Sequence, residues 1–295
     1  MARDYITALK LSLFVLSIAL FLFMSFSAWK LLTGTSMELL SYLNIASKHP
    51  MQEILPLDIT LLRLNGGMHG IAALILFISI IKLDIFSNKD CFQPLKWGLF
   101  ITLFSFVLLG SIFRIISNQQ GAALFFFASS VIYLLLLWQH SQQGFYTHGL
   151  WNYIMYLPVY LMILYTMGIP GYEKLFHMET VLPKYVDMFH GSFISKLPGG
   201  TTSMILLIGI FEQTVVVLLF VSILKGEFLI SEPKPWFKIA LLLCIIIFSM
   251  LCFGLTVVGN YQGAMNLLFY ATFTFLLLAS LGFPRMKCTA IEDHY

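Results

Sequence analysis

Positions 118–137 of the chain read NQQGAALFFFASSVIYLLLL, and positions 260–279 read NYQGAMNLLFYATFTFLLLA. The two segments share eight of twenty letters in register, beginning with the pattern Asn-x-Gln-Gly-Ala. A second pair of segments, HGIAALILFISIIK at 69–82 and EQTVVVLLFVSILK at 212–225, lies 143 residues apart, against 142 for the first pair. Two near-equal offsets indicate a duplicated unit, so we expect the chain to consist of two similar halves.

The composition of the chain sets its class. Of 295 residues, 59% are hydrophobic and only 11% are charged, and the mean hydropathy is +0.88. These values lie far outside the range of soluble domains and predict an integral membrane protein. An apolar run of about 18 or more residues is a candidate transmembrane helix, because about 20 residues are needed to cross about 30 Å of hydrocarbon. Eight runs qualify: 11–33, 60–82, 95–117, 121–139, 151–170, 201–226, 236–258 and 262–282.

These runs predict an all-α integral membrane protein with eight transmembrane helices, arranged as two four-helix units at 1–142 and 143–295. Because each unit has an even number of spans, the second re-enters the membrane from the same side, so the two repeats are parallel. Lys and Arg are more frequent on the side that holds both termini, ten against five. Cytoplasmic loops carry such an excess, so both termini are predicted to be cytoplasmic and the long loops at about 34–59 and 171–200 to face outward.

Two local features add to this topology. Pro158 lies inside the fifth run and removes one backbone donor, so we expect a kink in that helix. Amphipathic stretches at 37–43 and 185–193 in the outward loops are expected to form helices in the headgroup plane.

The sequence argues against several kinds of chemistry. The four cysteines, Cys91, Cys244, Cys252 and Cys288, form no C-x-x-C motif, and none lies in an outward loop. No phosphate-binding loop, zinc motif or nucleophile motif is present. The net charge of +3 provides no basic patch for nucleic acid. We therefore expect no metal site and no nucleic-acid partner, and the sequence identifies no cofactor.

Short motifs in both halves resemble those of the DoxX-like membrane proteins. In the first half, Leu62-Arg63 followed by Gly66-Gly67, with LGSIFRIIS at 109–117 and LLLWQ at 135–139, resembles a small uncharacterised bacterial family akin to DoxX. In the second half, GYEKL at 171–175 and GIFE at 209–212 are similar to DoxX itself. Together the motifs cover most of the chain.

The DoxX-like resemblance implies a four-helix membrane fold in each half and a location in the bacterial inner membrane. The functions that it implies are scattered: a membrane subunit of quinone-linked thiosulfate oxidation, partners of redox maturation systems, and cargo receptors. Unlike typical members, this chain is a tandem of two units.

Ionisable groups inside spans are candidates for functional residues, because each costs about 2.5–3.5 kcal/mol at the bilayer centre on insertion scales. Glu212 lies thirteen residues from Lys225 at the cytoplasmic edge, which places it about 20 Å across the membrane. The duplication puts His69 at the same depth in the equivalent helix. A buried carboxylate stays charged only beside a cation or hydrogen-bond donors, and Arg114, then Arg63, are the expected partners.

These groups and several amides near the same outer level predict a polar chamber that opens outward between the two units, with His69 and Glu212 on its floor. We expect the chamber to be lined by Glu212, His69, Arg114, Arg63, Gln120, Gln262, Asn65 and Asn260. The alternative is that the arginines extend to the interface, the amides cap short turns, and Glu212 makes one structural ion pair.

Three functions remain open. The absence of catalytic motifs favours an accessory subunit, or a component that binds a quinone or a lipid, within a membrane complex. The expected partner is another membrane protein, and a redox-linked complex is one form of this hypothesis. The parallel repeats and a carboxylate in the membrane favour a proton-coupled small-molecule transporter. The third reading is an enzyme that uses Glu212 and His69 as an acid–base pair.

Overall fold

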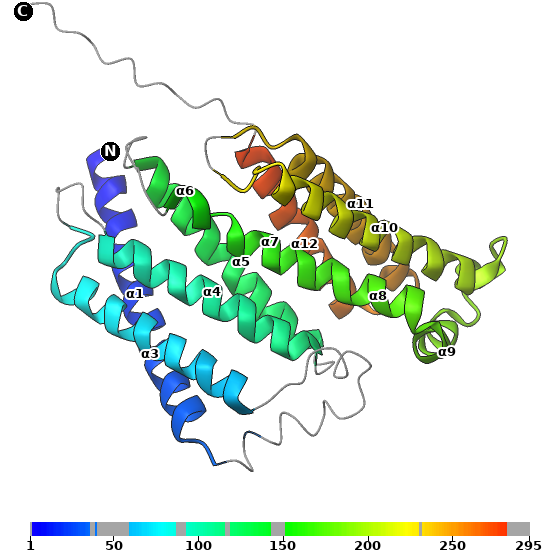
Figure 1. Cartoon of the computed structure of the whole chain (residues 1–295), viewed down its shortest axis with the longest axis horizontal. Coiled ribbons are helices and arrows are strands. Elements are labelled where there is room, and N and C mark those ends of the chain that lie inside the picture. Colours follow the sequence, from blue (N-terminus) through cyan, green and yellow to red (C-terminus); the bar gives the residue numbers. More distant parts are fainter. Residues whose placement is uncertain are drawn as a thin grey trace, which may run out of the picture.

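The computed structural model describes residues 2–35, 39, 59–86, 93–115, 119–142, 151–229 and 232–281. Within these ranges all regular structure is helical (Figure 1). Seven of the helices are long and apolar enough to cross a membrane, so the chain is a polytopic integral membrane protein that is embedded in a lipid bilayer. They are α1 (Ala2–Thr33), α3 (Ile59–Ile81), α4 (Gln93–Ile115), α5 (Gln119–Gln142), α10 (Gly200–Leu224), α11 (Pro235–Val257) and α12 (Tyr261–Ser280).

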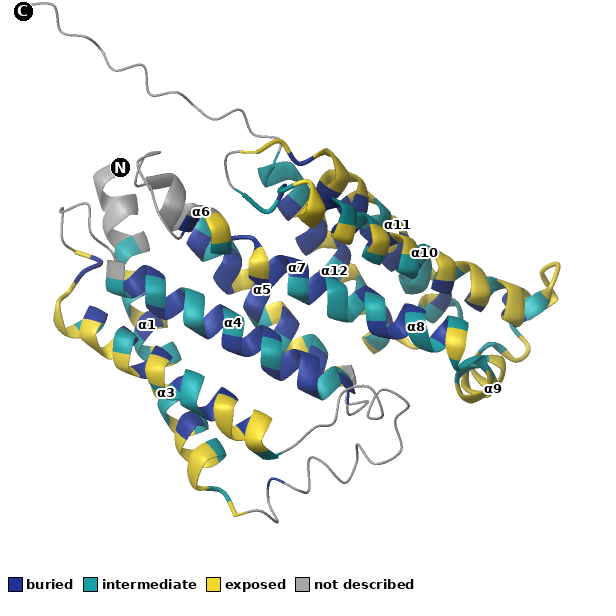
Figure 2. Ribbon diagram, viewed as in Figure 1, coloured by how far each residue is buried: buried dark blue, intermediate teal, exposed yellow. Residues whose placement is uncertain are grey.

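The outer faces of these helices are apolar. On α3, for example, Leu64, Ile71 and Leu74 are exposed, whereas Ala72 and Leu76 are buried. Figure 2 shows how exposed and buried residues alternate along the helices. In lipid, the exposed side chains contact acyl chains and the helix satisfies every backbone donor and acceptor. A helix that is apolar on all sides is therefore stable in this setting.

The fifth predicted span, 151–170, differs from the expectation because it is not one uninterrupted α-helix. Pro158 lies in the first turn of a helix, and residues 155 and 156, directly before that helix, form a turn that interrupts the helical path. The interruption lies where the sequence predicts a kink. The helical path also continues beyond the predicted end. Its consecutive parts are α6 (Trp151–Ile154), α7 (Leu157–Ile163), the π-helical turn η3 (Leu164–Gly168) and α8 (Ile169–Phe176).

The segment after α8, which is predicted to be an outward loop with an amphipathic helix at 185–193, contains more helix than predicted. It contains α9 (Met178–Phe189) and the short 3-10 turn η4 (Phe193–Lys196). Helix α9 overlaps the amphipathic stretch predicted at 185–193 and packs against α8 and α10. The other amphipathic stretch, 37–43, lies outside the described residues except for Leu39.

Helices that follow one another in sequence are neighbours in space (Figure 1). In the first half α1 packs on α3, α3 on α4 and α4 on α5. In the second half α8 packs on α10, α10 on α11 and α11 on α12. The halves meet where α4 contacts α7 and where α5 contacts α12, with the ring centroids of Phe127 and Phe269 5.1 Å apart. One apolar core extends through both halves.

The turns that follow α3 and α10 have the same geometry. In each turn, the residue before a buried acidic residue has a positive φ, 49° at Leu83 and 72° at Gly226. The amide of the acidic residue donates to the carbonyl of a serine five residues earlier, over 3.3 Å for Asp84 and 3.0 Å for Glu227. The paired positions are 143 residues apart, which is the offset of the aligned segments.

Candidate functional site

A buried ion pair joins α8 to α10. The Lys174 ammonium donates to both carboxylate oxygens of Glu212, with each N···O distance 2.6 Å. Lys174 is 3% exposed and Glu212 is 2% exposed. A charge removed from water is costly unless an opposite charge lies in direct contact with it, so each of these residues holds the other in place.

Two glycines allow the helices to approach closely enough for this ion pair. A Cβ atom added at Gly171 of α8 would lie 2.9 Å from Cβ of Glu212, and one at Gly209 of α10 would lie 3.0 Å from Cβ of Lys174. Side chains larger than hydrogen at these positions would push α8 away from α10. The motifs GYEKL and GIFE therefore form one contact, in which each supplies a glycine and a charge.

The π-helical turn η3 lies next to the ion pair. The side-chain amide of Gln213, adjacent to Glu212, donates to the carbonyl of Gly168 at the end of η3 over 2.9 Å. A π-helical turn leaves backbone groups outside the regular α-helical ladder, and such turns are frequent at functional sites. Gln213 thus stabilises the irregular backbone from the neighbouring helix.

A cavity of about 920 Å³ adjoins the ion pair and lies between the two halves. Residues of α4 and α5 line one side, and residues of η3 and of α8 to α12 line the rest. Its apolar wall includes Phe126, Ile208, Phe248 and Leu267. Sites for small molecules have this character, with mostly apolar walls and a few polar groups that orient the ligand. The polar wall includes Arg114, Gln120, Glu173, Lys174, Glu212, Asn260, Gln262, Asn266 and Tyr270.

Both copies of the Asn-x-Gln-Gly-Ala pattern border this cavity. Gln120 lies in the first turn of α5, and Gln262 lies in the first turn of α12. Asn260 is the N-cap of α12, where its side-chain oxygen accepts from the amide of Gly263 over 3.0 Å. The side chain of Asn260 therefore has a capping role as well as a place on the cavity wall. Asn118, the equivalent residue in the first copy, lies outside the described residues.

His69 and Asn65 lie elsewhere, in the contacts that α3 makes within the first half. The Nδ1 atom of His69 is 2.8 Å from the hydroxyl oxygen of Ser27, and the hydroxyl of Ser105 donates to the Asn65 side-chain oxygen over 3.1 Å. Both side chains are buried. Among the described residues, neither lines the cavity, and Arg63 is exposed and does not line it either. The expectation that His69 lies on the chamber floor beside Glu212 is therefore corrected, and the acid–base pairing of these two residues loses its geometric basis.

The partner of Glu212 also differs from the prediction. Arg114 is close enough for an electrostatic interaction with Glu212, but Lys174 makes the direct contact. The sequence predicts Lys174 to lie in an outward loop, because the apolar run ends at position 170. The signal that could have identified it is the helical spacing between Gly171 and Lys174, which puts both side chains on one face of α8.

A second polar cluster, which was not predicted from the sequence, lies at the opposite end of α10. The Glu227 carboxylate accepts from the hydroxyl of Ser222 and from the amide of Phe237 at the start of α11, both over 2.8 Å. The hydroxyl groups of Tyr160 and Ser222 are 2.6 Å apart. The Lys234 ammonium donates to the carbonyl of Glu227 over 2.6 Å. A carboxylate at a helix N-terminus is stabilising, so we interpret this cluster as the structural link between α10 and α11.

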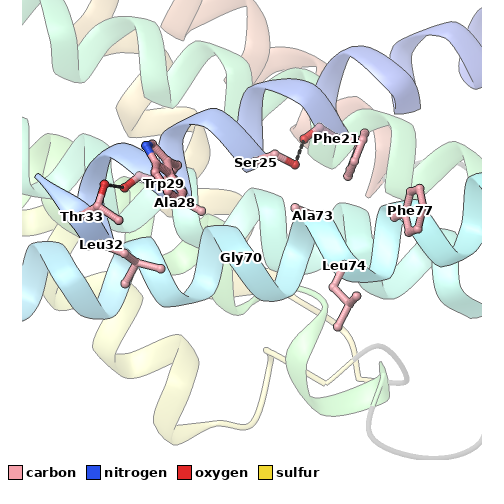
Figure 3. Close-up of a pocket in the computed structure, with 10 residues that line it drawn as sticks. All are labelled: Phe21, Ser25, Ala28, Trp29, Leu32, Thr33, Gly70, Ala73, Leu74 and Phe77. Atoms are coloured by element: carbon pink, nitrogen blue, oxygen red, sulfur yellow. Dashed lines mark hydrogen bonds between the residues drawn. The ribbon is translucent and has the colours of Figure 1, made fainter.

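A groove between α1 and α3, of about 530 Å³, is apolar and open to the membrane (Figure 3). Its base contains Ala28, Gly70 and Ala73, and Trp29 and Phe77 stand at its sides. In Figure 3, the two hydroxyl groups on its wall, Ser25 and Thr33, bond to backbone carbonyls of their own helix. The two hydroxyl protons on the wall are therefore already donated within α1. Within the described ranges, no cluster of three or more His, Cys, Asp or Glu residues suits a metal ion.

No protein-family model, curated protein or solved structure matches this chain. The DoxX-like resemblance therefore rests on the short motifs alone.

Proposed function

We propose that this protein is a ligand-binding accessory component of a membrane complex, and that it holds a lipid or a quinone in the cavity between its halves. The observation that carries this proposal is the cavity itself, a mainly apolar chamber with a buried Lys174–Glu212 pair in its wall. An amphiphile from the bilayer matches such a chamber, because its chain contacts the apolar wall while its head contacts the few polar groups.

In this proposal the chain is a tandem of two parallel four-helix units, 1–142 and 143–295, with the path from α6 to α8 as the eighth crossing. The matching turns at Leu83 and Gly226 support a duplication, as does the same order of helix packing in each half. The DoxX-like motifs support the family and a bacterial inner-membrane location. Two of them, GYEKL and GIFE, meet at the ion pair beside the cavity.

The test of this function is purification of the full chain in a mild detergent, followed by mass spectrometry of all retained proteins and small molecules. We expect a lipid or quinone at about one copy per chain, together with a membrane-protein partner. A chain that retains neither would contradict the proposal.

A proton-coupled transporter is the second candidate, and the π-helical turn η3 favours it. Transporter sites often lie at interrupted helices between repeats, and Thr166 and Met167 of η3 line the cavity. Liposomes that contain the protein would then show a proton flux that depends on a small solute. A flux that is independent of both pH and solute would rule transport out.

A further inference from the structure

The charges on the cavity wall do not cancel. Lys174 neutralises Glu212 through the 2.6 Å contacts, and Glu173 has an interaction partner of its own. Arg114 and Lys184 also line the cavity, and within the described part of the chain neither makes a hydrogen bond or an ion pair. Arg114 is partly buried, at the end of α4. Among the described residues on the wall, the cations Arg114, Lys174 and Lys184 outnumber the anions Glu173 and Glu212 by one. A partly buried cation is stabilised by a nearby anion, so the described wall favours a negatively charged ligand.

Two helix N-termini add to this positive potential. The first turns of α5 and α12, which carry Gln120 and Gln262, border the cavity. Each N-terminus carries the positive end of a helix dipole, which favours anionic groups nearby. The N-termini support the inference only together with Arg114, because the Asn260 side chain already accepts a hydrogen bond from one of the amides at the start of α12.

The remainder of the cavity suits a hydrocarbon chain. Phe126 of α5, Phe248 of α11 and Leu267 of α12 form a continuous apolar wall from both halves. The volume of about 920 Å³ is at the upper end of the range for small-molecule sites, so the cavity has room for a head group and part of a chain. An entirely polar anion would leave this wall without a partner.

We propose that the cavity binds an amphiphile with an anionic head group, a carboxylate or a phosphate, which contacts the Arg114 guanidinium. Lys184 of α9 provides a second cation on the wall. The proposal rests on the proposed function, because it names the chemical class of the ligand in the same cavity. It also excludes a neutral quinone as the preferred ligand.

The test uses photoactivatable ligands with the full chain in mild detergent. Three probes carry the same diazirine on the same chain: hexadecanoic acid, hexadecanol, and a phosphatidic acid that contains the hexadecanoyl chain. After irradiation, peptide mass spectrometry locates and quantifies the labelled residues. The variants are Arg114→Gln, which removes the charge, Arg114→Lys, which keeps it, and Arg63→Gln, which alters an exposed arginine away from the cavity.

We expect an anionic probe to label cavity residues at least about tenfold more strongly than the alcohol, since a charge-assisted hydrogen bond has this effect on affinity. Arg114→Gln should reduce this labelling to the level of the alcohol, whereas Arg114→Lys should restore part of it and Arg63→Gln should leave it unchanged. Labelling by phosphatidic acid but not by the free acid identifies a bilayer lipid as the source. Labelling by the free acid identifies a fatty acid.

Two results would overturn the inference, and they differ in what they say about the proposed function. Equal labelling of the cavity by acid and alcohol, unchanged in Arg114→Gln, would contradict the anionic head group and leave an amphiphile site in place. The absence of cavity labelling by all three probes would contradict both the inference and the proposed binding of a lipid in this cavity.

Discussion

At the scale of single residues, the central feature is the Lys174–Glu212 pair. Each charge is buried, and each is compensated mainly by the other. Such pairs rarely stabilise a protein more than a well-packed apolar pair would, but removal of one partner leaves an isolated buried charge. If the pair is only a structural contact, removing one partner destabilises the protein and replacing both partners by apolar residues restores stability.

We predict that Lys174→Met lowers the free energy of unfolding by about 3 kcal/mol, because Glu212 then lacks its counter-ion. Adding Glu212→Leu to this variant should recover most of the loss. The measurement is a double-mutant cycle by equilibrium unfolding in mixed micelles, with the exposed Lys184→Met as a control that changes stability little. Additive losses in the double variant would contradict the pairing.

At the scale of helices, the account depends on two close approaches and two sharp turns. The glycines at the contact of α8 and α10 determine whether the charged residues meet. The turns after α3 and α10 determine where the next helix of each half begins. Each of these features is tested by exchanging one small residue.

We predict that Gly171→Ala and Gly209→Ala each lower the free energy of unfolding by about 2 kcal/mol, because the added methyl group contacts rigid Cβ atoms of the partner helix. Gly67→Ala in α3 is the matched control, since no atom lies within 4 Å of the added carbon. This control should stabilise the protein by up to about 1 kcal/mol through helix propensity. Equal effects at all three positions would show that α8 and α10 do not approach closely.

The two turns lead to predictions of opposite sign. Leu83 adopts a positive φ of 49°, which costs a residue with a side chain about 1 kcal/mol, so Leu83→Gly should stabilise the protein. The equivalent change in the other direction, Gly226→Ala at a φ of 72°, should destabilise it by a similar amount. Thermal unfolding of both variants checks the pair. A destabilising Leu83→Gly would mean that the two turns are not equivalent.

At the scale of the whole molecule, the two-unit arrangement makes a topological prediction. Eight crossings place both termini on one side of the membrane and α9 on the other, whereas seven would separate the termini. Single cysteines introduced near each terminus and at Lys184, in a variant without the four native cysteines, can be labelled in intact spheroplasts by a reagent that does not cross the membrane. We expect labelling at Lys184→Cys only. Labelling at one terminus would exclude an even number of crossings.

Much of this architecture is predictable from the sequence, because span length depends only on composition. The runs at 201–226 and 236–258, for example, coincide within two residues with α10 and α11. The fifth run is the exception. Its apolar stretch ends at position 170, whereas α8 continues to Phe176, so the sequence places Lys174 in a loop. Which residues meet was less predictable. The depth of a residue in the membrane follows from counting along its helix, and this count predicts the same depth for His69 and Glu212. The direction of a side chain does not follow, because a membrane helix that is apolar on all sides has no amphipathic pattern.

The most direct test of the central claim, that an amphiphile occupies the cavity between the halves, is native mass spectrometry of the wild-type chain beside a cavity-filling variant. Ala123→Trp adds a large side chain to the cavity wall, and Leu74→Trp, on an exposed face of α3, is the matched control. The account predicts a bound amphiphile in the wild type and in Leu74→Trp, and its loss in Ala123→Trp. The same bound molecule in all three chains, or none in the wild type, would contradict the account.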